Sequence, residues 1–200
     1  LIKMDFLGLK ELKILQQAVD LIEERNKIKI DLDTLPLDDA KTYELFANGH
    51  TIGIFQFSKP KMREYLAKLK PKNINDLAAM NALYRPGPMD LIPEFIDRKH
   101  GRKDVTYLHP DMELVLNETY GVIVYQEQVM QLVRVIAGYS LAKADLVRRA
   151  MGKKDEKLMK EQEEEFIKGA AEKGYNKKVA KEIFKLILKF ADYFFNKSHS

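Results

Sequence analysis

Cysteine is absent from this sequence of 200 residues, and histidine is scarce. Without thiols the chain forms neither disulfides nor thiolate metal sites, and a cysteine nucleophile is excluded. The four histidines, at positions 50, 100, 109 and 199, do not form a pair with zinc-ligand spacing. A chain without cysteine fits a reducing compartment, so we expect a cytoplasmic protein.

Long apolar runs are also missing, since no segment approaches the roughly 20 residues that a helical membrane span requires. Gly169 and Gly174 have the spacing of a P-loop, but Tyr175-Asn176 follows where Lys and Ser or Thr are needed. No dinucleotide-binding glycine fingerprint occurs. No nucleophile elbow precedes Ser198 and His199, so a hydrolase triad has little support.

What the sequence does contain is enough apolar material for a core, because 46% of its residues are hydrophobic. Lys and Arg number 34 against 30 Asp and Glu, and the net charge of +4 only mildly favours an anionic partner. Neither internal repeats nor a Pro/Gly/Ser-rich linker interrupts the chain, so we expect one domain. Leu1 and Ser200 are interpreted as cuts within a longer protein.

Apolar spacing predicts a mainly α fold with a small β element. Ile2, Met4 and Phe6 alternate with polar residues, which predicts a short N-terminal strand, and Thr51 to Phe57 is β-prone and predicts a second strand. Helical spacing predicts helices over approximately 9–26, 38–48, 61–69, 75–83, 89–99, 110–116, 125–137, 140–151, 156–173 and 176–195. The expected caps include Asp38 for the second helix, Ser140 for the eighth and Asn176 for the last.

Five short polar segments stand out from this helical pattern. They are Asp5 within Lys3–Gly8, then Tyr84–Pro88, Tyr125–Gln128, Arg148–Lys154 and Phe195–His199. One carboxylate and four groups of cations, amides and hydroxyls are the chemistry that a magnesium-bound polyphosphate requires. Taken alone, a strand aspartate such as Asp5 more often faces water than binds a metal.

The segment Tyr84–Pro88 predicts a stiff turn, because Pro86 keeps Arg85 out of the α region. Pro88 suits the first position of a new helix, whose amides beside Arg85 would form an anion site. The alternative is an ordinary turn whose arginine pairs with a neighbouring carboxylate.

Residues 142–154 concentrate positive charge. Five basic residues face one acid, Asp145, which gives a local net charge of +4; the five are Lys143, Arg148, Arg149, Lys153 and Lys154. Arginine forks match phosphate oxygens, so this segment predicts phosphate binding. A solvated basic helix end that complements its own dipole explains the charge equally well.

The last polar segment follows a bulky apolar stretch abruptly. Lys197 could meet a phosphate, Asn196 and Ser198 could bond a sugar or phosphate oxygen, and the His199 imidazole could pack beside the sugar. The alternative is a frayed polar terminus. For Tyr125–Gln128 the preferred interpretation is structural, with buried amides and a carboxylate bracing a loop.

In their residues and their order along the chain, these segments resemble the catalytic alpha subunit of bacterial DNA polymerase III, a C-family DNA polymerase. The resemblance covers most of the chain and rests on Met4–Leu9, Gly53–Gln56, Ala82–Met89, Thr119–Val122, Val124–Met130, Ala137–Tyr139, Arg148–Lys154 and Phe195–Ser200. The chain departs from the family pattern at residues 58–61, Ser-Lys-Pro-Lys, where an acid and a glycine are usual.

The resemblance implies that residues 1–9 are the last strand of the palm and that 10–200 are part of a helical fingers domain. It implies template-directed addition of deoxynucleotides to a primer 3′-hydroxyl with two Mg2+ ions, and Asp5 as one of three metal-binding aspartates. It also implies primer-template DNA and deoxynucleoside triphosphates as partners, and the sliding clamp, clamp loader and proofreading exonuclease in the full-length family.

Roles for individual residues follow from the same resemblance. Arg148, Arg149 and Lys197 correspond to triphosphate-binding residues. His199, with Ser198, corresponds to a gate that disfavours a 2′-hydroxyl. Arg85 and Lys153 are weaker candidates for substrate or backbone contacts.

Without the resemblance, the residues are also compatible with two other functions. One is a non-catalytic helical module that binds nucleic acid through the basic residues of 143–154. The other is a protein-interaction scaffold with solvated charged faces, which would have no affinity for phosphate.

Overall fold

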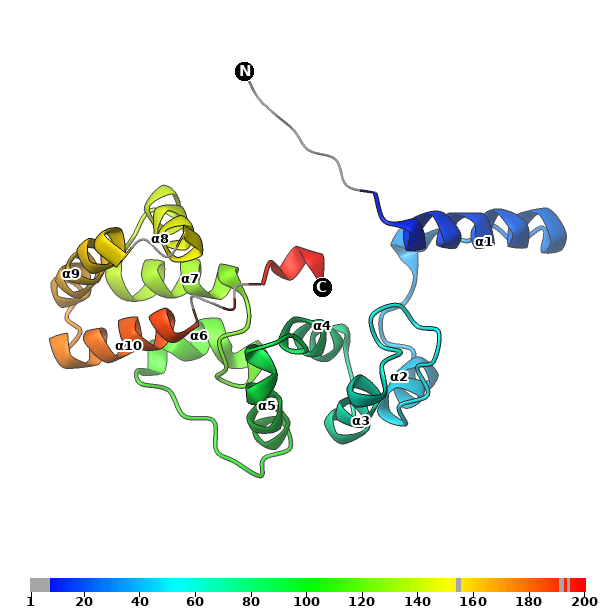
Figure 1. Ribbon diagram of the computed structural model, residues 1–200, viewed down its shortest axis with the longest axis horizontal. Coiled ribbons are helices and arrows are strands. Elements are labelled where there is room, and N and C mark those ends of the chain that lie inside the picture. Colours follow the sequence, from blue (N-terminus) through cyan, green and yellow to red (C-terminus); the bar gives the residue numbers. More distant parts are fainter. Residues whose placement is uncertain (1–7, 154–155, 191–192, 194) are drawn as a thin grey trace, which may run out of the picture.

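The computed structural model describes residues 8–153, 156–190, 193 and 195–200 (Figure 1). The α-helices are α1 (Lys10–Asn26), α2 (Ala40–Ala47), α3 (Pro60–Leu69), α4 (Ile74–Leu83), α5 (Ile92–Lys99), α6 (Glu113–Leu116), α7 (Gln126–Ala137), α8 (Leu141–Lys153), α9 (Glu156–Glu172) and α10 (Lys177–Lys189). Short 3-10 helices are η1 (Leu32–Thr34), η2 (Pro88–Leu91), η3 (Pro110–Met112), η4 (Asn117–Thr119) and η6 (Lys197–His199).

The expectation of a mainly α fold is therefore correct, but the β element is wrong. Within the described ranges no residue belongs to a strand. Thr51 to Phe57 forms consecutive turns, in which Ile54 N donates to Thr51 O and Phe57 N to Ile54 O. Gly53 and Gln56 adopt left-handed backbone angles, with φ of 84° and 65°, and these angles end any extended run.

The predicted N-terminal strand is not supported either. Gly8 and Leu9 precede α1 without strand structure. The remainder of that prediction, residues 1–7 with Asp5, lies outside the described residues.

Helix starts follow local capping chemistry. Ser140 Oγ accepts from Lys143 N at 3.2 Å, and Asn176 Oδ1 accepts from Lys178 N at 2.8 Å, as the sequence predicts. For α2 the cap is Asp39 rather than Asp38, because Asp39 Oδ2 accepts from Thr42 N at 2.8 Å. The last helix is shorter than predicted and ends at Lys189.

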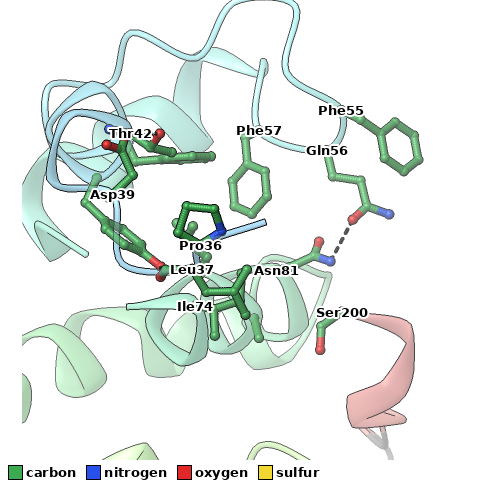
Figure 2. Close-up of a pocket in the computed structure, with 14 residues that line it drawn as sticks. Pro36, Leu37, Asp39, Thr42, Phe55, Gln56, Phe57, Ile74, Asn81 and Ser200 are labelled. Carbon is green, nitrogen blue, oxygen red and sulfur yellow. Dashed lines mark hydrogen bonds between the residues drawn. The ribbon is translucent and has the colours of Figure 1, made fainter. Parts of the chain in front are cut away.

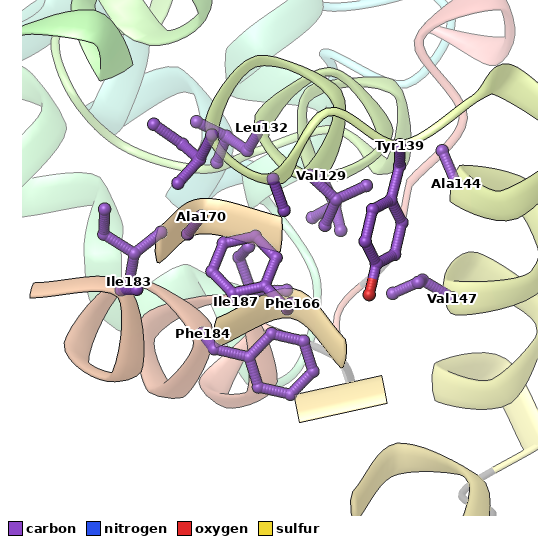
Figure 3. Close-up of a cluster of buried hydrophobic side chains, with 14 of the residues drawn as sticks. Val129, Leu132, Tyr139, Ala144, Val147, Phe166, Ala170, Ile183, Phe184 and Ile187 are labelled. Atoms are coloured by element: carbon purple, nitrogen blue, oxygen red, sulfur yellow. The ribbon is translucent and has the colours of Figure 1, made fainter. Parts of the chain in front are cut away.

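The C-terminal helices enclose one hydrophobic cluster. Helix α7 packs against α8 and α9, and α9 packs against α10. Leu132, Phe166 and Phe184 are fully buried, and the two phenylalanine rings lie 5.2 Å apart (Figure 3). A Cβ at Gly169 would lie 2.5 Å from Ala137 O, so α9 approaches α7 this closely only because that position lacks a side chain.

A second cluster fills the space among α2 to α5. Met62, Leu66, Met80 and Phe95 are each fully buried there. Fully burying side chains of this size stabilises a fold by about 1.5–3 kcal/mol each before chain entropy is counted. This cluster fixes the position of α4, which ends immediately before the Tyr84–Pro88 turn.

The extended segment 122–125 joins the two clusters. Val122 and Val124 belong to the α2–α5 cluster, whereas Ile123 belongs to the C-terminal cluster. Successive side chains of an extended backbone point to opposite sides, so three consecutive apolar residues can serve two cores. The start of α7 is therefore held from both sides.

In Figure 1 the molecule is elongated, with α6 to α10 at one end and α1 at the other. Helix α1 exposes several leucines, among them Leu12 at 63% of its surface. No helix in the described part of the chain combines the length and apolar character needed to cross a bilayer.

Candidate functional site

Three of the five polar segments, far apart in sequence, meet where α4 ends and α7 begins. Gln126 N donates to Phe195 O at 2.9 Å, and an Arg85 guanidinium nitrogen donates to Tyr193 O at 2.7 Å. Figure 1 shows η6 in the space between α7 and α4. The C-terminal segment is thus docked onto the other two segments rather than frayed.

Arg85 is the centre of this junction. Its Nε donates to Ala82 O at 2.9 Å, and the guanidinium lies 4.6 Å from the centroid of the Phe195 ring. Burial lowers the pKa of this guanidinium from its usual value, although arginine stays protonated in proteins. The half-buried cation therefore holds Phe195 in place and carries positive charge into the junction.

The sequence predicted an anion site made of free backbone amides at the following helix start. In the structure, two of these amides are already hydrogen-bonded. The helix there is the 3-10 helix η2, and its amides are bonded, with Met89 N donating to Arg85 O at 3.1 Å and Asp90 N to Gly87 O at 3.4 Å. Gly87 has a φ of 98°, and a Cβ there would lie 2.1 Å from the Tyr193 ring. The turn brings the backbone close to Tyr193 instead.

Gln128 braces the loop before α7, as the sequence indicates. Its Oε1 accepts from Val124 N at 2.8 Å and Tyr125 N at 3.0 Å, and its Nε2 donates to Thr119 Oγ1 at 2.8 Å. The side chain is 2% exposed. One buried amide therefore satisfies the backbone donors of the N-cap residue of α7, Tyr125, and of the residue before it.

Lys197 is held by two carboxylates. Its Nζ lies 2.7 Å from Glu118 Oε2, and its backbone N donates to Glu127 Oε2 at 3.1 Å. The ammonium also lies 5.4 Å from the centroid of the Tyr125 ring. With 37% of its side chain exposed, Lys197 is fixed in direction yet open to solvent.

Ser198 and His199 complete the short helix η6. Ser198 N donates to Asn196 Oδ1 at 2.9 Å, and His199 N donates to Asn196 O at 3.0 Å. The imidazole lies 5.6 Å from the Phe195 ring, and both side chains are exposed. Asn196 is therefore a cap that shapes the turn presenting these two residues.

A pocket of about 470 Å3 opens beside Arg85. We call it the basic pocket; its lining residues are Phe55, Gln56, Lys59, Asn81, Tyr84, Arg85, Phe195 and His199. Lys59, Arg85 and His199 reach it from three separate segments, and none of the eight lining residues is acidic. Such a pocket favours an anionic group.

Arg148 and Arg149 lie on α8 and share one carboxylate. Arg148 Nε donates to Asp145 Oδ1 at 2.8 Å, and Arg149 Nε lies 2.7 Å from Asp145 Oδ2. The hydrogen bond from Arg148 holds the pKa of Asp145 below its usual value. Arg149 is 64% exposed and Arg148 32%, and neither lines the basic pocket.

Two predicted site residues remain, Lys153 and Asp5. Lys153 is the last residue of α8, and Asp5 is outside the described residues. Across the described ranges, no group of three or more His, Asp or Glu side chains is placed to hold a metal ion.

Sequence reasoning missed several residues of this site. Lys59, which lines the basic pocket, lies in the short stretch that departs from the family pattern. Glu118 holds Lys197 across a separation of 79 residues, which no local pattern reveals. Asp145 precedes the two arginines by three and four positions, so helical spacing alone could have predicted that pairing.

The fold and site together define a helical domain that presents cations and amides at a junction of distant segments. A sequence model of the family described as bacterial DNA polymerase III alpha subunit finger domain matches residues 11–174. The chain belongs to this family, as its sequence resemblance predicts.

Individual relatives agree with that membership. Over all 200 residues the chain is 54% identical to DNA polymerase III subunit alpha of Caulobacter vibrioides, 52% to that of Halalkalibacterium halodurans and 48% to that of Bacillus subtilis. The chain covers 17–18% of the length of these relatives.

Proposed function

We propose that this chain is the fingers region, with the adjoining edge of the palm, of a template-directed DNA polymerase. In this proposal residues 1–9 belong to the palm and 10–200 to the fingers, and the fingers bind the incoming deoxynucleoside triphosphate. The enzyme adds that nucleotide to a primer 3′-hydroxyl. The observation that carries the proposal is the docking of Lys197, Ser198 and His199 beside Arg85 and α7.

We assign the residues to the triphosphate or to the sugar of the nucleotide by their chemistry. Lys197, Arg148 and Arg149 bind the triphosphate, and Lys153 adds charge at the end of α8. His199 and Ser198 contact the sugar. Because carboxylates already orient Lys197 and both arginines, little side-chain freedom is lost when they bind phosphate.

Asp5 is the proposed ligand of magnesium, with further carboxylates supplied from outside this chain. Among the described residues no group of three or more His, Asp or Glu side chains is placed to hold the ion. The sliding clamp, clamp loader and proofreading exonuclease, with a cytoplasmic location, remain predictions from the family resemblance. Primer-template DNA is the partner that the proposed reaction requires.

Replacing Lys197 with alanine should raise the KM for deoxynucleoside triphosphates about tenfold in primer extension by the intact subunit. A hydrogen bond to a charged group contributes about 1.5–3 kcal/mol, and solvent exposure here favours the lower end. Lys185→Ala, which removes an exposed lysine from α10, is the matched control. An unchanged nucleotide dependence in Lys197→Ala would reject the assignment.

Replacing His199 with alanine should raise incorporation of ribonucleotides relative to deoxynucleotides about tenfold. Removing the imidazole opens space beside the sugar, and steric discrimination of this size corresponds to about 1–3 kcal/mol. The ratio of kcat/KM for ATP and dATP measures the effect. If that ratio stays at the wild-type value, His199 does not contact the sugar.

A further inference from the structure

A second pocket, of about 330 Å3, adjoins the basic pocket (Figure 2). We call it the aromatic pocket, because Tyr43, Phe46, Phe55 and Phe57 contribute to its wall. Its volume lies within the range typical of small-ligand sites. None of the functions proposed above uses it.

The walls of the aromatic pocket are held in place by their own contacts. The Phe46 and Phe57 rings meet edge to face at 5.3 Å, and Tyr43 OH donates to Leu37 O at 2.5 Å. The one acidic lining residue, Asp39, accepts from Thr42 N and from Thr42 Oγ1, at 2.8 Å and 2.6 Å. Its carboxylate therefore caps α2, and the pocket interior stays predominantly apolar.

An amide pair marks the border between the two pockets. Asn81 Nδ2 donates to Gln56 Oε1 at 2.6 Å, a bond visible in Figure 2. Gln56, Asn81 and Phe55 line both pockets. The bond uses one donor of Asn81 and one acceptor position of Gln56, which leaves the Gln56 amide nitrogen and the Asn81 carbonyl oxygen for a ligand.

We propose that the two pockets together hold one nucleotide of single-stranded DNA. The base enters the aromatic pocket and meets the amide pair at its edge, and the phosphate lies in the basic pocket near Lys59 and Arg85. Aromatic faces accept any base, and a neighbouring cationic groove follows the backbone, which is the usual chemistry of sequence-tolerant single-strand binding.

The combination of features favours this occupant over a purely apolar one. An aliphatic side chain would leave the Gln56 amide nitrogen and the Asn81 carbonyl oxygen without partners and would make no use of the adjoining cations. The proposal rests on the proposed function, since it assigns single-stranded DNA from a polymerase substrate to this surface. It differs from the binding of the incoming nucleotide, which is assigned to Lys197, Ser198, His199 and the arginines of α8; of these, only His199 lines the basic pocket.

Binding of a fluorescein-labelled oligothymidylate to the intact subunit, without magnesium or nucleotide, tests the proposal directly. Phe55→Ala should weaken this binding about tenfold, because it removes a stacking surface. Phe55 is 48% exposed, so its replacement leaves both hydrophobic clusters intact. The control is Ile52→Ala, which removes a 76% exposed side chain from the same loop outside both pockets and should leave the affinity unchanged.

Photo-cross-linking with an oligonucleotide that contains 5-iododeoxyuridine provides a second measurement. The expected adducts are on Tyr43, Phe55 or Phe57. Equal affinities of wild type and Phe55→Ala, or adducts confined to other segments, would overturn the proposal. Cross-linking blocked by free deoxynucleoside triphosphate but not by unlabelled oligothymidylate would also overturn it.

The test separates this proposal from the polymerase function. Oligonucleotide binding is measured without catalysis, so a failure of primer extension would not reject the proposed binding of single-stranded DNA. Conversely, a Phe55→Ala subunit with normal oligonucleotide affinity and normal extension would reject the pocket assignment alone.

Discussion

Replacing Arg148 with alanine is expected to raise the KM for deoxynucleoside triphosphates by about 10- to 100-fold in the intact subunit. The guanidinium is oriented by Asp145 and two-thirds buried, and a hydrogen bond between such a group and phosphate contributes roughly 1.5–3 kcal/mol. Steady-state primer extension at varied nucleotide concentration measures the change. Arg149→Ala should act in the same direction, with a smaller effect because Arg149 is more exposed.

A surface ion pair elsewhere in the chain provides the control. Arg102 Nε lies 2.8 Å from Asp97 Oδ1, with both side chains about half exposed, and Arg102→Ala should leave the KM unchanged. If Arg148→Ala instead weakens DNA binding with a reduced salt dependence while nucleotide use is normal, α8 contacts nucleic acid phosphates. That result would favour the non-catalytic binding module.

Replacing Gln128 with leucine is expected to destabilise the fold by about 3 kcal/mol. The change leaves the backbone N–H groups of Val124 and Tyr125 buried without acceptors, and each unsatisfied group costs about 1–3 kcal/mol, partly offset by the added apolar burial. Urea unfolding of the 200-residue chain, followed by circular dichroism, measures the loss.

The matched control is Gln131→Leu on the same helix. Gln131 is exposed, so the same chemical change should alter the free energy of unfolding by less than about 0.5 kcal/mol. Equal unfolding midpoints for the two variants would show that the Gln128 amide does not brace the start of α7. A large loss confined to Gln128→Leu would also link the fold to the site, because Gln126 N at the same helix start holds Phe195 O.

Local patterns predicted most of the helices because their causes are local. The caps at Ser140 and Asn176 bond amides two or three residues away, and the apolar spacing of α7 matches the face that it buries. The same reasoning failed at Thr51–Phe57. The β-prone composition there was overridden by left-handed angles at Gly53 and Gln56 and by turn hydrogen bonds.

The candidate site was only partly accessible to such reasoning. Its residue types and their order indicated a polyphosphate chemistry and a polymerase family, and the comparisons confirmed the family. The partners of those residues were not predictable. For Arg85 the expectations were an anion site or a pair with a carboxylate, and neither named its bonds to Ala82 O and Tyr193 O or its packing on the Phe195 ring.

The sequence by itself determined the helical class, the family and the residues that carry charge, because propensity, capping and motif order act over a few neighbouring positions. Only the tertiary structure decided which of those residues meet. Glu118 bonds Lys197 and Gln56 bonds Asn81, across 79 and 25 residues, because distant helices bury their apolar faces together in the two hydrophobic clusters. Contacts of that kind depend on how apolar faces are buried together, which no short stretch of sequence specifies.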